Sequence, residues 1–93
     1  MAGLKEYREQ VTACDQQLMR ILKERLEVCA QIGEYKKVND MPVVQSTRFE
    51  DLQELWANEA VAYGLDKDFA CRMFRMIHDE SVRIQNEIIK GER

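Results

Sequence analysis

The apolar residues in the N-terminal third of the chain recur at intervals of three, four or seven positions, which is the spacing of one face of a helix. No proline interrupts this stretch, and Gly33 is its only internal glycine. The pattern predicts one helix over about residues 4–37, roughly 50 Å long at about 1.5 Å per residue. A helix of that length exceeds the diameter of a compact domain of this size, so it needs something further to pack on. The apolar positions are Leu4, Tyr7, Val11, Cys14, Leu18, Ile21, Val28, Ile32 and Tyr35.

The remainder of the chain predicts two shorter helices. The segment VNDMPVVQS contains turn formers and the single proline, so it predicts a loop. Thr47 and Glu50 have the spacing of a capping box, which indicates a second helix over about residues 47–63. Asp66 is a suitable N-cap for a third helix over about residues 66–90. The fold class predicted is therefore all-α, a three-helix chain with a long first helix.

Length and composition favour a single domain spanning residues 1–93. Such a small domain buries only a modest share of its surface, so association with a second chain would stabilise it. The net charge of −3 provides no general basic field for nucleic acid or an anionic membrane. No apolar run is long enough to span a bilayer, and the N-terminus lacks the features of a secretory signal. We expect a cytoplasmic protein that binds neither nucleic acid nor membranes.

The three cysteines, Cys14, Cys29 and Cys71, are odd in number and lack CxxC spacing. Their apolar neighbours predict reduced, buried thiols. Together with His78 they do not form a paired ligand pattern for zinc. The sequence therefore predicts no metal site and no cofactor.

Charged residues interrupt the apolar face of the long helix. Arg8, Arg25 and Lys36 share the register of its apolar residues, and Asp15 is the only acid in that register. Basic side chains at a helix seam can extend to solvent and merely set the register or the oligomeric state. Burying several cations without matching acids is costly, however, so an anionic ligand is the natural counter-charge for the set.

An intertwined antiparallel homodimer would bring these cations together. Arg8 and Arg25 are seventeen residues apart, so roughly 25 Å of straight helix separates them. If two long helices pair antiparallel about residue 21, Arg8 of one copy lies opposite residue 34 of the other, between Arg25 and Lys36. The pairing would also give each long helix its packing partner.

The later helices place further polar groups near the same point. Arg48 stands at the start of the second helix, while Ser81 and Gln85 lie one turn apart on the apolar side of the third. The expected pocket holds four cations, a hydroxyl and an amide, which suits a dianion bound through arginine–carboxylate contacts. His78 lies beside the apolar stripe, where a lone histidine is more often structural than catalytic.

Three segments carry a resemblance to a known family. YREQVTACDQQLMRILKERLEVCAQIGEYKK, MPVVQSTRFEDL and IHDESVRIQ occur in order along about residues 4–90. Together they resemble the first helix, the loop into the second helix and the third-helix signature of the all-helical, AroQ-class chorismate mutases. The resemblance implies a homodimer in which each active site borrows the first-helix arginine of the partner.

The resemblance also implies the reaction and the site residues. Chorismate would rearrange to prephenate because the site holds the dianion in its reactive conformer and stabilises negative charge on the ether oxygen. By position, Lys36 and Gln85 would contact this oxygen, and Arg25 would bind a carboxylate. The other positions implied to line the site are Arg8 from the partner copy, Arg48, Ser81, Ile32 and Val82.

Two positions depart from the family pattern. Phe49 stands where members commonly carry a glutamate that accepts a hydrogen bond from the C4 hydroxyl of chorismate, and Gln45 replaces a frequent aspartate. Gln45, or a backbone group of the loop, would then bind this hydroxyl. The departures leave two related activities open, isochorismate pyruvate lyase and aminodeoxychorismate mutase.

Gln45 with Arg48–Phe49 also resembles mutase domains fused to DAHP synthase, which suggests such a domain or partner. A helical dimerisation or regulatory module without turnover is the alternative of another class.

Overall fold

The structure is a computed structural model that describes residues 2–92 of the chain. It contains three helices, α1 (Leu4–Val38), α2 (Ser46–Ala62) and α3 (Lys67–Lys90), and no strand in the part described. Each helix begins and ends within one residue of the bounds predicted from the sequence. The predicted all-α class, with a long first helix, is confirmed.

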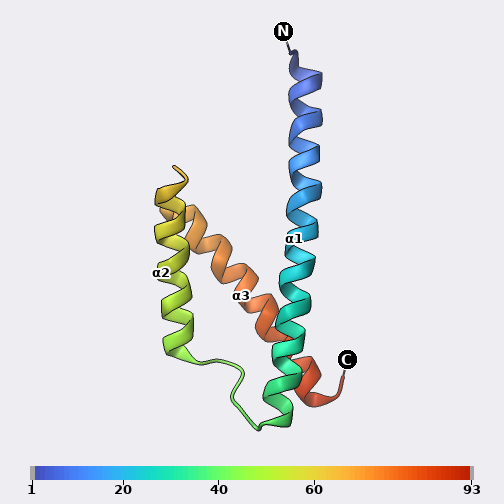
Figure 1. Cartoon of the computed structure of the whole chain (residues 1–93), viewed down its shortest axis with the longest axis vertical. Helices are drawn as coiled ribbons and strands as arrows, with labels where there is room; N and C mark the ends of the chain where they lie inside the picture. Colours follow the sequence, from blue (N-terminus) through green and yellow to red (C-terminus); the bar gives the residue numbers. More distant parts are fainter. Residues whose placement is uncertain (1, 93) are drawn as a thin grey trace.

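The third helix holds the molecule together. Figure 1 shows α3 crossing from the end of α2 to the C-terminal part of α1, and α3 packs against both of these helices. Within the described residues, α1 and α2 make no packing contact with each other. The N-terminal half of α1 projects away from the other two helices, which gives the chain extents of 57 × 28 × 14 Å.

The core is small and lies mainly between α2 and α3. Phe74 is fully buried, and its ring centroid lies 5.5 Å from that of Trp56 and 5.4 Å from that of Phe49. Burying a phenylalanine side chain contributes about 1.5–3 kcal/mol, so this cluster anchors α2 on α3. The other buried apolar residues are Ala57, Ala60, Ala70, Ile84 and Ile88.

The apolar face of α1 is uncovered in the single chain. From Leu4 at 63% exposure to Ile32 at 42%, its large side chains remain accessible along the whole helix. The expectation that the three thiols are buried is therefore wrong for the single chain. Cys14 is exposed on this face, Cys29 and Cys71 are half-buried, and all three are free.

The helix starts differ in how they are capped. Asp66 accepts a hydrogen bond from the backbone nitrogen of Phe69 at 2.7 Å, as its position predicted. The capping box predicted at Thr47 and Glu50 is wrong, because α2 begins one residue earlier with Gln45 as its N-cap. Thr47 therefore lies inside the first turn, beyond the position from which a cap acts.

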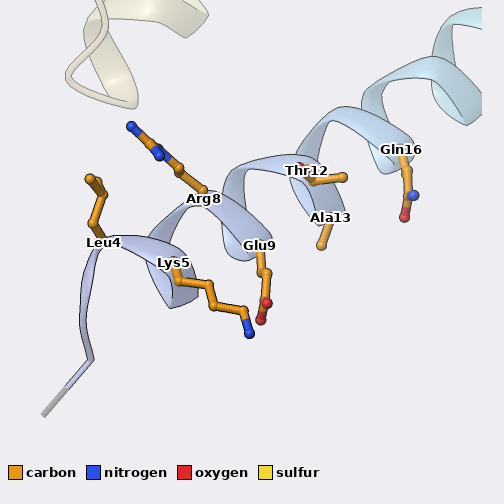
Figure 2. A pocket seen from close by; sticks show the side chains of 7 residues that line it. All are labelled: Leu4, Lys5, Arg8, Glu9, Thr12, Ala13 and Gln16. Carbon is orange, nitrogen blue, oxygen red and sulfur yellow. The ribbon is translucent and has the colours of Figure 1, made fainter.

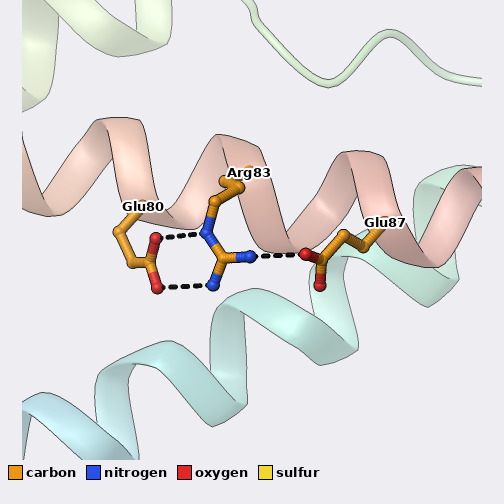
Figure 3. Close-up of polar contacts among 3 residues, drawn as sticks. All are labelled: Glu80, Arg83 and Glu87. Atoms are coloured by element: carbon orange, nitrogen blue, oxygen red, sulfur yellow. Dashed lines mark hydrogen bonds and ion pairs between the residues drawn. The ribbon is translucent and has the colours of Figure 1, made fainter. Parts of the chain in front are cut away.

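An exposed ion-pair network lies on α3 beside α1. Arg83 forms two hydrogen bonds to Glu80, of 2.6 and 2.8 Å, and a third to Glu87 (Figure 3). The two carboxylates raise the pKa of Arg83 further above its already high value.

Among the described residues, no helix combines the length and the apolar character needed to cross a membrane.

Candidate active site

A cavity of about 510 Å³ lies where α1, the loop before α2, α2 and α3 meet. Each helix contributes both polar and apolar side chains to its walls. From α1 come Arg25, Val28, Cys29, Ile32 and Lys36; from the loop and α2 come Val43, Gln45, Arg48, Phe49 and Leu52; from α3 come His78, Ser81, Val82 and Gln85.

The structure brings eight of the nine sequence-predicted site residues to this cavity. They are Arg25, Ile32, Lys36, Gln45, Arg48, Ser81, Val82 and Gln85. The ninth, Arg8, is exposed near the N-terminal end of α1, in a shallow groove that also includes Leu4 and Thr12 (Figure 2). A single chain therefore does not carry Arg8 to the cavity.

A hydrogen-bond network fixes the end of the cavity nearest the loop. The Lys36 ammonium donates to the Val43 carbonyl at 2.6 Å and to the amide oxygen of Gln85 at 3.0 Å. The amide nitrogen of Gln85 in turn donates to the Ser81 hydroxyl oxygen at 3.0 Å. Among residues 2–92, Ser81 and Gln85 are the buried polar residues, and both lie on the side of α3 that faces α1. The network thus joins α1, the loop before α2 and α3 around the Lys36 ammonium and the Gln85 amide.

The close approach of α1 to α3 depends on Gly33. It is the buried residue of α1, and a Cβ placed there would lie 3.1 Å from Cγ and 3.2 Å from Cα of Gln85. Any side chain at this position would press on the backbone of α3. Gly33 therefore allows Gln85 to come within hydrogen-bonding distance of Lys36, one turn of α1 further along.

The charge in the cavity is one-sided. Arg25, Lys36 and Arg48 supply three cations, and no aspartate or glutamate is among its lining residues. Lys36 has three donors, of which two are used, and the Gln85 amide nitrogen has two, of which one is used. One donor of each side chain thus remains available. Such a cavity suits an anion that accepts several hydrogen bonds.

Burial changes the protonation of two lining groups. Desolvation lowers the pKa of the Lys36 ammonium from its ordinary value of 10.5. Desolvation also lowers the pKa of His78 from 6.5; nearby Asp79 opposes this shift, while the cations Arg25 and Lys36 add to it. Both shifts reflect the cost of holding positive charge in a partly buried site, and for His78 the two neighbouring cations increase that cost.

Sequence reasoning did not assign six of the lining residues to the site. They are Val28, Cys29, Val43, Phe49, Leu52 and His78. Helical spacing offered a signal for four of them. Val28 and Cys29 lie one turn after Arg25, Leu52 lies one turn after Arg48, and His78 lies three residues before Ser81. His78 packs edge-on against Phe49, with ring centroids 4.7 Å apart. The histidine predicted to be structural therefore lies at the cavity wall.

Within residues 2–92 no group of three or more histidine, cysteine, aspartate or glutamate side chains is arranged to hold a metal ion. The polar groups that line the cavity are three cations, two amides, a hydroxyl, a thiol and an imidazole, a set without carboxylates that suits an anion.

Comparison with known proteins identifies the family. The sequence model of the family described as chorismate mutase type II matches residues 7–86 of the chain. The chain belongs to the chorismate mutase type II family. The match covers most of α1, all of α2 and most of α3, and with them every residue that lines the cavity.

Two relatives show what this family includes. The chain is 30% identical over 82 residues to a 4-amino-4-deoxychorismate mutase of Streptomyces pristinaespiralis, covering 88% of this chain and 64% of the relative. It is 31% identical over 83 residues to the bifunctional chorismate mutase/prephenate dehydratase of Escherichia coli K12, covering 89% of this chain but only 22% of that protein. The second activity in the name of that longer relative is prephenate dehydratase, whereas the sequence suggested a DAHP synthase domain or partner.

Proposed function

We propose that the protein is a chorismate mutase, which rearranges chorismate to prephenate. The observation that supports this most directly is the Lys36–Gln85 pair, 3.0 Å apart, at the end of a cavity whose lining has three cations and no carboxylate. Chorismate carries two carboxylates and an ether oxygen, so it matches both the charge and the donors of this cavity. Membership of the chorismate mutase type II family gives independent support.

The rearrangement needs no nucleophile and no proton transfer. The ether C–O bond of chorismate breaks as a new C–C bond forms within the same molecule, so atoms and electrons balance internally. Arg25 and Arg48 would bind carboxylates and hold the dianion in its compact reactive conformer. The remaining donors of Lys36 and Gln85 would meet the ether oxygen, where negative charge develops in the transition state. Ser81 holds the Gln85 amide in place and assists with a carboxylate.

The apolar contacts of the substrate would come from the two aliphatic residues assigned from the sequence. Ile32 on α1 and Val82 on α3 both line the cavity. Gln45, at the N-cap of α2, would face the polar edge of the substrate.

A complete site requires a second copy of the chain. In the proposed antiparallel homodimer, two α1 helices pair through the apolar face that is uncovered in the single chain. Arg8 of each copy would then enter the cavity of the other and add a fourth cation. This arrangement accounts for both the exposed apolar residues of α1 and the isolated position of Arg8.

The second candidate substrate is 4-amino-4-deoxychorismate. The Streptomyces pristinaespiralis relative is named for its mutase reaction, and α2 carries Phe49 where the family resemblance implies a glutamate that accepts from the C4 hydroxyl. Isochorismate pyruvate lyase is the third candidate activity, and its substrate is isochorismate. All three substrates share the dicarboxylate framework, so the cations alone do not distinguish them.

The experiment that tests the function compares all three substrates. Purified protein is added to chorismate, 4-amino-4-deoxychorismate or isochorismate, substrate absorbance is followed, and the products are identified by mass spectrometry. We expect prephenate from chorismate. Preferential turnover of the amino compound would move the assignment to that mutase, and salicylate with pyruvate from isochorismate would move it to the lyase. Turnover of none of the three by a folded dimer would instead support a non-catalytic module.

We retain the DAHP synthase domain or partner as a proposal that rests on Gln45 with Arg48–Phe49. Its test is to mix the chain with purified DAHP synthase from the same source. Co-elution and a rise in mutase activity are expected. Separate elution with unchanged activity would remove DAHP synthase as a partner.

A further inference from the structure

His78 is a titratable group in the cavity that the proposed mechanism does not use. It lies on α3, one turn before Ser81, and it lines the same cavity as Arg25 and Lys36. Its ring contacts the rings of Phe49, at 4.7 Å, and Phe74, at 5.7 Å, which fix it at the junction of α2 and α3. Among the hydrogen bonds found between described residues, none involves its imidazole.

The cavity is poor in hydrogen-bond acceptors. Arg25, Lys36 and Arg48 donate only, and no carboxylate lines the walls. The amide oxygen of Gln85 already accepts from Lys36, and the Ser81 oxygen already accepts from Gln85. A ligand that carries a hydroxyl as well as two carboxylates therefore finds few groups that can accept its proton.

His78 can supply the missing acceptor. Burial lowers its pKa below the ordinary 6.5, the α1 cations Arg25 and Lys36 lower it further, and Asp79 on its own helix opposes them. Arg48 of α2 adds a third cation to the same cavity. The imidazole is therefore neutral near pH 7, and a neutral imidazole has one nitrogen that accepts and one that donates.

We propose that His78 is a specificity-determining residue, whose imidazole accepts a hydrogen bond from the C4 hydroxyl of chorismate. The inference rests on the proposed function and adds to it the group that recognises the uncharged end of the substrate. Phe49 packs edge-on against the imidazole ring and holds it in place. Phe49 also forms the α2 wall of the cavity at this point, and its side chain has no polar group that could bind the hydroxyl. Gln45 is the competing acceptor, since its amide also lines the cavity.

The test is a double-mutant-type cycle, in which a change in the protein at His78 is combined with a change in the substrate, the removal of its C4 hydroxyl. His78→Phe keeps a planar ring against Phe49 but removes both nitrogens, and kcat/KM is measured with chorismate and with 4-deoxychorismate. We expect His78→Phe to lower kcat/KM for chorismate by about threefold to tenfold, the effect of one hydrogen bond between neutral groups. For 4-deoxychorismate the same substitution should change kcat/KM by less than about 1.5-fold, because the interaction is already absent. His78→Asn, which keeps an acceptor, should recover part of the preference for chorismate.

Three controls keep the interpretation specific. Met76→Leu changes an exposed residue of the same helix and should behave as the unmodified protein with both substrates. Thermal melting of each variant shows whether it folds, and His78→Leu serves as a second variant if His78→Phe does not. Gln45→Leu is measured in the same cycle to test the competing acceptor.

The outcomes separate this proposal from the function on which it rests. Equal losses with both substrates would make His78 structural and overturn the assignment, as would a hydroxyl-dependent loss in Gln45→Leu without one in the His78 variants. If the unmodified protein converts no chorismate, the proposed function fails and the assignment fails with it. If the unmodified protein converts chorismate but the effect of the His78 substitutions does not depend on the substrate hydroxyl, the role of His78 is overturned and the proposed function stands.

Discussion

The Lys36 ammonium of α1 lies 3.0 Å from the amide oxygen of Gln85 on α3, and the same amide donates to Ser81. This relationship sets the direction of the Gln85 amide, because its oxygen is held by a cation and its nitrogen therefore faces the hydroxyl. It also ties the C-terminal end of α1 to α3 through one half-buried and two buried polar side chains. The pair thus serves both the packing of the helices and the proposed chemistry.

Replacing Lys36 should remove most of the activity. Lys36→Met retains the aliphatic length but removes the charge, so the developing negative charge on the ether oxygen loses a preorganised donor. Removing one such donor lowers kcat by roughly 100- to 1,000-fold. Steady-state kinetics with chorismate measure the effect. Lys37→Met is the matched control, because Lys37 is the adjacent lysine, is exposed and does not line the cavity, and the substitution should leave kcat unchanged. Similar kcat values for Lys36→Met and the unmodified protein would remove Lys36 from the catalytic machinery.

Gly33→Ala should disturb the site without changing any polar group. Alanine favours a helix over glycine by about 1 kcal/mol, but overpacking a close contact costs about 1–3 kcal/mol. The added Cβ would meet the Cα of Gln85 at 3.2 Å, which cannot move away by a rotation of the side chain. We expect a small loss of stability, up to about 2 kcal/mol, and a fall in kcat of roughly tenfold to 100-fold from displacement of Gln85.

The control for the glycine is Gln31→Ala, on an exposed position of the same helix. Chemical denaturation and kinetics are measured on both variants. If Gly33→Ala is more stable than the unmodified protein and fully active, the close approach of α1 and α3 does not constrain the site.

The sequence predicted the fold well because helical periodicity is a local property. The register of α1 also placed Arg25, Ile32 and Lys36 on one face, and these three residues do line the cavity. The N-terminal start of α2 was less predictable, since Thr47 and Glu50 satisfy the capping-box spacing while the backbone begins the helix at Ser46. The choice between adjacent starts depends on the loop that precedes them, and local spacing does not describe that loop.

The remaining site residues were hidden for a different reason. His78 is an aromatic residue beside an apolar stripe, and from the sequence alone such a residue indicates packing. Phe49 occupies a position that the family resemblance places in the site, but its apolar ring offers no polar group to which a role could be assigned. Both do pack, against each other and against Phe74, yet both also line the cavity. Whether one side chain faces core or cavity depends on how α2 and α3 are rotated about their axes. That rotation is set by packing between helices, which spacing within one helix does not specify.

Sharing of the site between two copies predicts complementation. Arg8→Ala removes a residue remote from the cavity of its own chain, whereas Gln85→Ala removes one inside it. Each homodimer should be nearly inactive because both of its sites are damaged. After mixing under conditions that exchange subunits, each heterodimer should contain one intact site, so activity should recover to as much as about one quarter of the unmodified level.

Native mass spectrometry with one isotope-labelled chain confirms that exchange has occurred. Mixing two preparations of the same variant is the control and should give no recovery. Confirmed heterodimers without recovered activity would exclude the proposed placement of Arg8 in the partner's site. A monomeric chain with full activity would exclude the dimer itself as a requirement.

Activity and the Lys36 contribution to stability should change in opposite directions at alkaline pH. Burial lowers the pKa of Lys36 below 10.5, so the ammonium loses its proton in the folded protein at a lower pH than in the unfolded chain. Loss of the cation should reduce kcat as pH rises through this lowered pKa. Between the two values the unfolded chain binds more protons, so the contribution of Lys36 to folding stability becomes more favourable as pH rises. Chemical denaturation of the unmodified protein and of Lys36→Met, from about pH 8 to about 10.5, isolates that contribution. Two results would show that Lys36 is not the titrating cation of this site. One is a constant kcat up to about pH 10.5, and the other is a free energy of unfolding of the unmodified protein that falls relative to that of Lys36→Met as pH rises.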